Sequence, residues 1–206
     1  MSGVRIGIDF DNTIICYDKV FAAVARQRGL VPEGWDGLKN EVRDHLRSRE
    51  GGELAWQGLQ GFVYGKGIGG AEVYPGVQEF LATCSLAGAK VYIVSHKTRY
   101  GHQDPDRTDL RDAARSWLRG AGLIDTADAA LSAGDVYFED TQAGKVDRLA
   151  SLKLDVFIDD LVDVFEQPHF PTTTRSILFT RSQRPCPARC KPIATWAEIR
   201  REVFAA

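Results

Sequence analysis

Two aspartates, Asp9 and Asp11, stand one residue apart directly after a largely apolar run at residues 4–8. Such a run predicts a buried β-strand. Strand side chains alternate between faces, so both carboxylates can reach one ligand only if the strand ends there, and the turn-favouring Asn12 and Thr13 predict that it does. Two converging carboxylates suit a hard divalent cation, or a division into nucleophile and proton donor. The alternative interpretation is a solvated, Asp-rich turn after an edge strand.

Three further groups with chemical potential lie at the ends of later apolar runs. Ser95 ends one run, Lys145 lies near a helix start, and Asp159, Asp160 and Asp163 follow another run. Each has a plain structural alternative, because a strand-end serine is commonly a cap, a helix-start lysine is commonly solvated, and an acidic pair is commonly an N-cap. Ligands of open α/β sheets bind at the carboxyl ends of the strands, where all of these groups would lie.

Apolar runs and helical repeats alternate along most of the chain. Strands are predicted at residues 89–94, 136–138, 156–158 and 176–179. Helices are predicted around residues 110–118, 146–150 and 195–203. The alternation predicts an α/β fold in which helices cover both faces of a parallel sheet.

One interval is too long for this pattern. About 60 residues separate Thr13 from Pro75, where a crossover needs one loop and one helix. Apolar residues recur at helical spacing in three stretches, at residues 21–25, 38–46 and 54–63. We therefore expect a helical insertion over residues 16–74, with the glycine-rich residues 65–70 as a hinge back to the sheet.

The order of the motifs is more specific than any one of them. Asp-x-Asp-x-Thr at residues 9–13, then Ser95, then Lys145, then a strand followed by Asp159-Asp160 resembles the four motifs of the haloacid dehalogenase-like (HAD) superfamily of phosphohydrolases. The resemblance covers roughly residues 3–13 and 75–200, and the double Asp is similar to a variant of the family's common Gly-Asp form. It implies a Rossmann-like catalytic core at residues 1–15 and 75–206. Residues 16–74 resemble the helical cap that covers the site and selects substrates.

The resemblance also implies a role for each catalytic residue. Asp9 would attack phosphorus and form an aspartyl-phosphate, which splits a difficult hydrolysis into two steps. Asp11 would move the protons of both steps, and Thr13 would position the loop. Ser95 and Lys145 would bind the phosphate oxygens. Because a departing halide needs no proton, the presence of Asp11 favours phosphoryl transfer over dehalogenation.

A metal is implied in the same way. Mg²⁺ would be held by Asp9, by the backbone carbonyl of Asp11 and by an acid of the last motif. Asp160 occupies the position of the Asp in the Gly-Asp form and is favoured over Asp159 as the ligand. Asp159 and Asp163 would orient metal-bound water or Lys145.

Candidate substrate-binding residues lie in two places. His96 and Lys97 open a polar loop after Ser95, and its many hydrogen-bond donors suit a phosphosugar or a nucleotide. In the insertion, Arg43 and Arg47 lie one helical turn apart and could meet an anionic leaving group. The alternative for these arginines is a solvated helix face.

Composition limits the function classes. The chain has 206 residues, a formal net charge of -2 and a pI near 6.1, so we expect no global basic field and no nucleic-acid partner. No apolar run reaches the roughly 18 residues of a membrane span and no signal-peptide core precedes Asp9, so we expect a cytoplasmic protein without a membrane partner. The four cysteines are then expected as free thiols.

The sequence thus predicts a Mg²⁺-dependent phosphatase acting on a small phosphorylated metabolite, either a sugar phosphate or a nucleoside monophosphate. One alternative is a phosphatase of nucleic-acid ends or of protein phospho-residues, which would need an open site. Another is a binding module that keeps the fold without turnover. The sequence predicts no oligomeric state.

Overall fold

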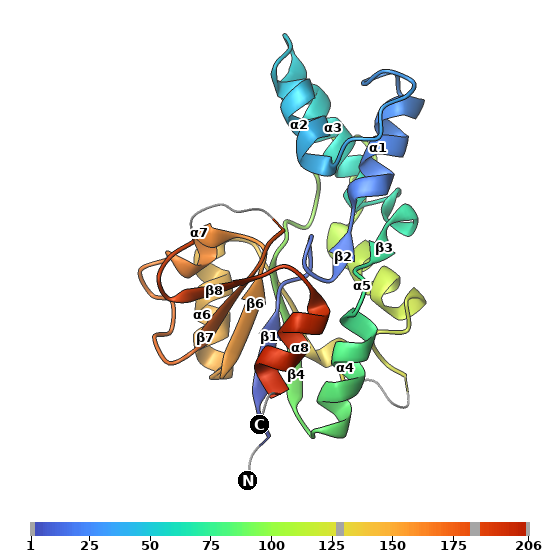
Figure 1. Ribbon diagram of the computed structural model, residues 1–206. Coiled ribbons are helices and arrows are strands. Elements are labelled where there is room, and N and C mark those ends of the chain that lie inside the picture. The colour runs from blue at the N-terminus through green and yellow to red at the C-terminus, as the bar shows by residue number, and fades with distance from the viewer. Residues whose placement is uncertain (1–2, 127–129, 182–185, 205–206) are drawn as a thin grey trace. The chain divides into compact units, whose positions relative to one another are not determined.

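The computed structural model describes residues 3–126, 130–181 and 186–204, and the chain divides into two compact units (Figure 1). The first unit comprises residues 1–15, 73–97 and 118–206. The second comprises residues 16–72 and 98–117. The helical insertion of the second unit therefore ends slightly before the expected boundary at residue 74. The unit also includes residues 98–117, which the sequence assigns to the catalytic core.

The first unit is built on a six-stranded parallel sheet with the strand order β5-β4-β1-β6-β7-β8 (Figure 1). The strands are β1 (Arg5–Ile8), β4 (Lys90–His96), β5 (Val136–Glu139), β6 (Val156–Asp159), β7 (Arg175–Phe179) and β8 (Cys190–Ile193). The predicted strands are confirmed. The edge strand β8 was not predicted, because Lys191 and Pro192 interrupt its apolar pattern, as is common where an edge must resist further pairing.

Helices cover both faces of the sheet, as predicted. Leu178 packs in one apolar cluster with Val146 and Leu149 of α6 (Gln142–Leu152) and with residues of α7 (Val162–Phe165). The next residue, Phe179, points to the opposite face, where its ring centroid lies 5.9 Å from that of Trp196 in α8 (Trp196–Phe204). Helix α4 (Val77–Leu86) packs against α8 through Phe80. The fold is thus a Rossmann-like α/β fold.

The topology sets the position of Asp9. Strand β1 lies between β4 and β6, with Ile8 in register with Ile93 and Ile158. The residue that follows Ile8 therefore emerges at the carboxyl edge, between the ends of its two neighbours.

The core of the second unit is a group of three mutually packed helices, α1 (Asp18–Gln27), α2 (Lys39–Arg47) and α3 (Gly52–Tyr64). The predicted helical repeats are confirmed. Phe21 and Trp56 are both buried and stack with their ring centroids 5.0 Å apart. A short 3₁₀ turn, η1 (Ile68–Gly70), follows α3.

Residues 98–117 join the second unit through close packing on α3. The backbone at Gly101 approaches Gly61 so closely that a Cβ atom at Gly101 would lie 2.7 Å from the Cα of Gly61. Lys66 Nζ lies 2.6 Å from Asp106 Oδ2, and the indole of Trp117, in α5 (Leu110–Gly120), donates to the Ala71 carbonyl at 3.3 Å. Residues 15–16 (β2, Ile15–Cys16) and 72–73 (β3, Glu72–Val73) pair as a small ribbon where the chain passes between the units.

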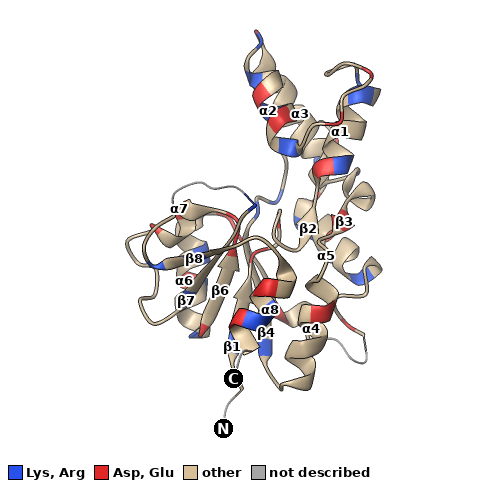
Figure 2. Ribbon diagram, viewed as in Figure 1, with Lys and Arg blue, Asp and Glu red and all other residues tan. Residues whose placement is uncertain are grey.

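Charge and cysteine placement agree with an ordinary globular chain. Acidic and basic residues are interspersed over the described residues (Figure 2). None of the helices in the described ranges has the length and apolar character needed to cross a bilayer. The four cysteines are free, and burial raises the pKa of the Cys84 thiol to about 12 and that of Cys190 to about 11.

The approach of Gly101 to Gly61 gives a stability test of the second unit. Replacing Gly101 with Ala should lower the free energy of unfolding by about 1–3 kcal/mol, because the new methyl group meets backbone atoms. Gly58→Ala is the matched control in the same contact region, since its Cβ would meet nothing closer than Gln103 Cβ at 4.0 Å. That control should gain about 0.5–1 kcal/mol through helix propensity. Urea denaturation followed by circular dichroism would check both values, and equal changes would contradict the packing.

Candidate active site

The loop after β1 turns as the sequence predicts. Strand β1 ends at Ile8, and the backbone N–H groups of Ile14 and Ile15 donate to the Phe10 carbonyl at 3.0 and 3.2 Å. Asn12 adopts a left-handed conformation with φ 58°, which asparagine tolerates better than most residues. The turn begins directly after the buried Asp9, whose N–H donates to the Ile158 carbonyl at 2.9 Å.

Lys145 joins two of the predicted acids. Its Nζ lies 2.6 Å from Asp9 Oδ1 and 2.6 Å from Asp159 Oδ2, and all three side chains are at least nine-tenths buried. Thr141 caps α6 by accepting a hydrogen bond from the Gly144 N–H at 3.0 Å, and this cap fixes the helix start that presents Lys145. Asp9 directly after β1, Asp159 of β6 and Lys145 of α6 thus meet at the carboxyl edge of the sheet.

The electrostatics of this group follow from its burial. Burial lowers the pKa of the Lys145 ammonium, but Asp159 and Asp9 raise it by more, so the pKa stays above its ordinary value and the lysine remains charged at neutral pH. Burial raises the pKa of the Asp159 carboxyl, Lys145 opposes that rise, and Asp9 adds to it. The pKa of Asp159 is raised overall, because the effect of burial, with the added repulsion from Asp9, exceeds the opposing effect of Lys145.

Three acids form a cluster with the spacing of a metal site. Carboxylate oxygens of Asp9, Asp159 and Asp160 lie within 4.8 Å of one another. Asp159 uses Oδ2 for Lys145, and its Oδ1 accepts the Leu161 N–H at 2.9 Å. An all-oxygen set of this kind fits a hard cation such as Mg²⁺.

Asp11 and Lys97 form a second charged pair. Lys97 Nζ lies 2.9 Å from both Asp11 Oδ1 and Asp11 Oδ2, and the lysine is only 3% exposed. The sequence predicted Lys97 as a substrate-binding residue and did not predict this pairing. The strand period indicates only that Lys97 lies on the same side of the extended chain as Ser95, because the two are two residues apart.

Thr13 and Ser95 are buried near the same edge. Thr13 Oγ1 donates to Asp9 Oδ2 across a long 3.5 Å, and the Thr13 carbonyl accepts the Trp196 indole N–H at 3.0 Å. Ser95 is 1% exposed on β4, in register with Phe138 of β5. Thr13 is therefore held by α8, which supports its predicted place in the loop.

The remaining predicted residues have other neighbours. His96 Nε2 lies 3.0 Å from the Asp140 carbonyl oxygen. Arg43 and Arg47 belong to the second unit, where Arg43 Nε pairs with Asp44 Oδ1 at 2.8 Å and Arg47 Nε with Glu53 Oε2 at 2.6 Å. Asp163 is exposed on α7. The structure thus brings Asp9, Asp159, Asp160 and Lys145 together, and separately pairs Asp11 with Lys97.

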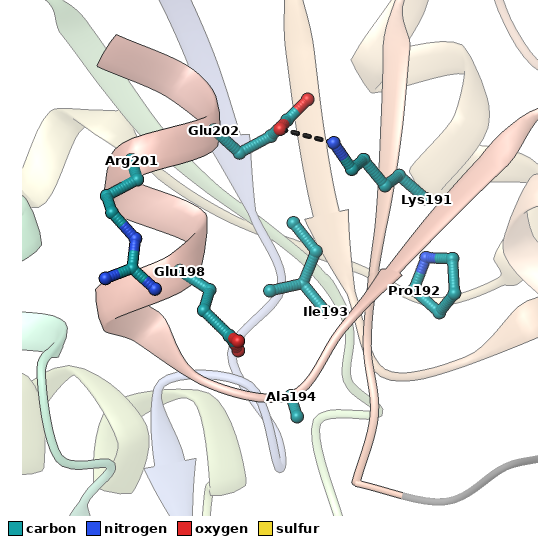
Figure 3. A pocket seen from close by; sticks show the side chains of 7 residues that line it. All are labelled: Lys191, Pro192, Ile193, Ala194, Glu198, Arg201 and Glu202. Carbon is teal, nitrogen blue, oxygen red and sulfur yellow. Dashed lines mark hydrogen bonds and ion pairs between the residues drawn. The ribbon is translucent and has the colours of Figure 1, made fainter. Parts of the chain in front are cut away.

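A hollow of about 520 Å³ lies elsewhere, between β8 and α8 (Figure 3). An ion pair between Lys191 Nζ and Glu202 Oε2, 2.6 Å apart, crosses one side of it. Arg201 and Glu198 add charges of both signs to its lining. None of the predicted site residues lines this hollow, so the acidic cluster remains the candidate active site.

Comparison with known proteins gives the class of fold. The sequence matches no protein-family model and no curated protein. The structure is similar to a HAD family hydrolase from Deinococcus radiodurans R1, solved with bound phosphate and sodium, with a TM-score of 0.61 at 17% identity over 99% of this chain and 96% of that chain. It is also similar to the putative HAD-hydrolase YfnB from Bacillus subtilis, bound to magnesium, with a TM-score of 0.62 at 9% identity over 100% of both chains.

A third similar structure is a predicted phosphoglycolate phosphatase from Haemophilus somnus, with a TM-score of 0.55 at 15% identity over 98% of this chain and 99% of that chain. At identities this low, the likeness establishes the fold. The chain has the fold of the HAD hydrolases, which confirms at that level the resemblance carried by the four short motifs.

The buried Lys145 gives a second stability test. Lys145→Met should lower the free energy of unfolding by about 3–5 kcal/mol, because it leaves Asp9 and Asp159 buried without their cation. Lys191→Met removes an ion pair of the same length at the exposed edge strand and should cost no more than about 1 kcal/mol. Urea titrations in the presence of a chelator would check both, and a loss for Lys145→Met as small as the control's would contradict the buried charge group.

Proposed function

We propose that this chain is a Mg²⁺-dependent phosphatase that hydrolyses a small phosphate monoester through an aspartyl-phosphate. The observation that carries the proposal is the buried group of Asp9, Lys145 and Asp159, with an oxygen of Asp160 within 4.8 Å of the other acids. Phosphoryl transfer needs alignment and charge neutralisation more than covalent chemistry from other groups. The Lys145 ammonium fixes the Asp9 carboxylate and so supplies the alignment. The neighbouring acids suit a cation, which would supply the charge neutralisation.

Asp9 is the proposed nucleophile. A carboxylate oxygen of Asp9 attacks phosphorus, the bond from phosphorus to the leaving oxygen breaks, and an aspartyl-phosphate forms. Water then attacks phosphorus, the bond to the Asp9 oxygen breaks, and inorganic phosphate leaves. Lys145 holds Asp9 Oδ1 at 2.6 Å throughout and so fixes the direction of attack.

Asp11 is the proposed acid and base. It gives a proton to the departing oxygen in the first step and takes one from the attacking water in the second. Loss of a halide would need neither transfer. The second carboxylate therefore supports a phosphate ester as the substrate rather than a haloacid.

The proposed metal ligands are Asp9 and Asp160 together with the backbone carbonyl of Asp11. Asp160 is favoured over Asp159, because it occupies the position of the Asp in the family's Gly-Asp form and lies in the acidic cluster with Asp9. When bound, Mg²⁺ would neutralise charge on the phosphate oxygens. Asp159 would not contact the cation directly and would instead orient Lys145.

A small phosphorylated metabolite, either a sugar phosphate or a nucleoside monophosphate, is the proposed substrate. Residues 16–72 and 98–117 form a separate unit, which supports a role as a substrate-selecting cap. Ser95 and Lys145 would bind the phosphate, and His96 lies at the end of the same strand as Ser95. Two alternative functions remain. The interspersed charges weigh against a phosphatase of nucleic-acid ends or phosphoproteins. The cluster of Asp9, Asp159 and Asp160 weighs against a binding module without turnover.

A screen of phosphorylated metabolites tests the proposal. Inorganic phosphate release would be measured with Mg²⁺ and with a chelator, over sugar phosphates, nucleoside monophosphates, a 5′-phosphorylated oligonucleotide and a phosphopeptide. Mg²⁺-dependent release from a small monoester is the expected result. Release only from the oligonucleotide or the phosphopeptide would favour the open-site alternative, and no release from any compound would favour the binding module.

Asp9→Asn tests the nucleophile. The amide keeps the shape but is a poor nucleophile, so kcat should fall by at least roughly 10³-fold while the protein remains folded. Asp147→Asn on the exposed face of α6 is the control and should leave kcat unchanged. Steady-state phosphate release with circular dichroism would measure both, and activity within about tenfold of the parent would remove Asp9 from this role.

Asp160→Asn tests the metal ligand. Loss of one charged oxygen should weaken Mg²⁺ binding by roughly 10- to 100-fold, measured by titration calorimetry, and should lower the unfolding free energy by less than Asp159→Asn does, because Asp160 is less deeply buried. Asp159→Asn should instead lower stability, since Asp159 is fully buried against Lys145. The opposite assignment of these two effects would make Asp159 the ligand.

A further inference from the structure

Lys97 carries a buried charge that has no role in the proposed reaction steps. The residue is 3% exposed, and its Nζ is placed 2.9 Å from each oxygen of the Asp11 carboxylate. A buried ammonium is costly unless it is paired, and a contact to both oxygens also restricts rotation of the partner. The pair therefore controls where the Asp11 carboxylate lies.

The backbone at Lys97 is fixed as well. Its N–H donates to the Glu139 carbonyl at 2.9 Å, which extends the pairing of β4 with β5 by one residue beyond His96. The ammonium also lies 5.4 Å from the centroid of the Phe10 ring, a buried residue next to Asp11. Both ends of the lysine side chain are thus held by the first unit, which contains Asp11.

We propose that Lys97 is a positioning residue that holds Asp11 in the direction needed for proton transfer; this inference rests on the proposed function. An ammonium can donate to one oxygen of a carboxylate or of a carboxylic acid, so the direction is kept in both steps of the reaction. Proton transfer needs the acid within hydrogen-bond reach of the leaving oxygen and then of the attacking water. Lys97 would supply that alignment from the side of β4.

This role differs from the predicted one, in which Lys97 binds substrate. A substrate ligand must exchange its partner for the substrate, and breaking this pair would leave the largely buried Asp11 carboxylate without its cation. Lys145 already provides an ammonium beside Asp9. The two roles also separate in kinetics, because loss of substrate binding raises KM, whereas loss of transition-state alignment lowers kcat.

The test is a double-mutant cycle in the 206-residue chain with saturating Mg²⁺. Lys97→Met should lower kcat by roughly 10- to 100-fold with KM within about threefold, because a misaligned acid loses most of its effect. In the Asp11→Asn background the same change should lower kcat by less than about threefold, since a residue that acts through Asp11 has nothing left to align. Lys97→Arg should recover part of the loss, because it restores a donor to both oxygens.

Lys90→Met is the matched control at the opposite end of β4, where Lys90 pairs with Asp135 at 2.7 Å. It should leave kcat and KM unchanged. Equal losses for Lys97→Met in both Asp11 backgrounds, or a raised KM at unchanged kcat, would overturn the inference.

A crystal structure of Lys97→Met keeps the inference testable without activity. Asp11 should leave its parent rotamer or occupy several, and an unchanged single rotamer would overturn the positioning role. The outcomes distinguish the two proposals. Absence of turnover by the parent protein would contradict the proposed function. An active parent in which the effects of Lys97→Met and Asp11→Asn are additive would contradict only the role of Lys97.

Discussion

The contact of the buried Lys145 ammonium with two carboxylates is the interaction on which the site depends. An ammonium and two carboxylates can be removed from water only if each finds its partners, and Lys145 reaches Asp9 and Asp159 at 2.6 Å each. Asp9 is 136 positions from Lys145 in the sequence, and Lys145 is 14 positions from Asp159. The three residues are brought together by a parallel sheet and by a helix that starts at its carboxyl edge. The contacts that form the fold therefore also form the charge group.

Charge balance connects the two lysines with the proposed cation. The candidate site contains four carboxyl groups, on Asp9, Asp11, Asp159 and Asp160, and two ammonium groups, on Lys145 and Lys97. Burial raises the pKa of the Asp159 carboxyl above its ordinary range, and Lys145, which is shared with Asp9, only partly opposes that rise. A divalent cation would relieve this excess of negative charge, and that is the physical reason for expecting one at the acidic cluster.

Much of the core could be predicted from sequence because its signals are local. The strand before Asp9 and the turn at Asn12 can each be seen in a short window. The same is true of the positions of Ser95 and Asp159 at strand ends and of Lys145 near a helix start. Strand β8 could not, since the edge residues Lys191 and Pro192 lack an apolar pattern. The grouping of residues 98–117 with the helical insertion depends on the contact between Gly61 and Gly101, and the pairing of Lys97 with Asp11 joins residues 86 positions apart.

The three cations first assigned to substrate now differ in what they can contribute. The pairs of Arg43 with Asp44 and of Arg47 with Glu53 are partly exposed, so water and salt weaken them and a substrate anion could replace the acid at little cost. Lys97 is buried against Asp11, and taking it away would expose an unpaired carboxylate to a poorly solvated site. The two arginine pairs are therefore easier to exchange for another anion than the Lys97 pair, and this difference agrees with the proposal that Lys97 positions Asp11 and does not bind substrate.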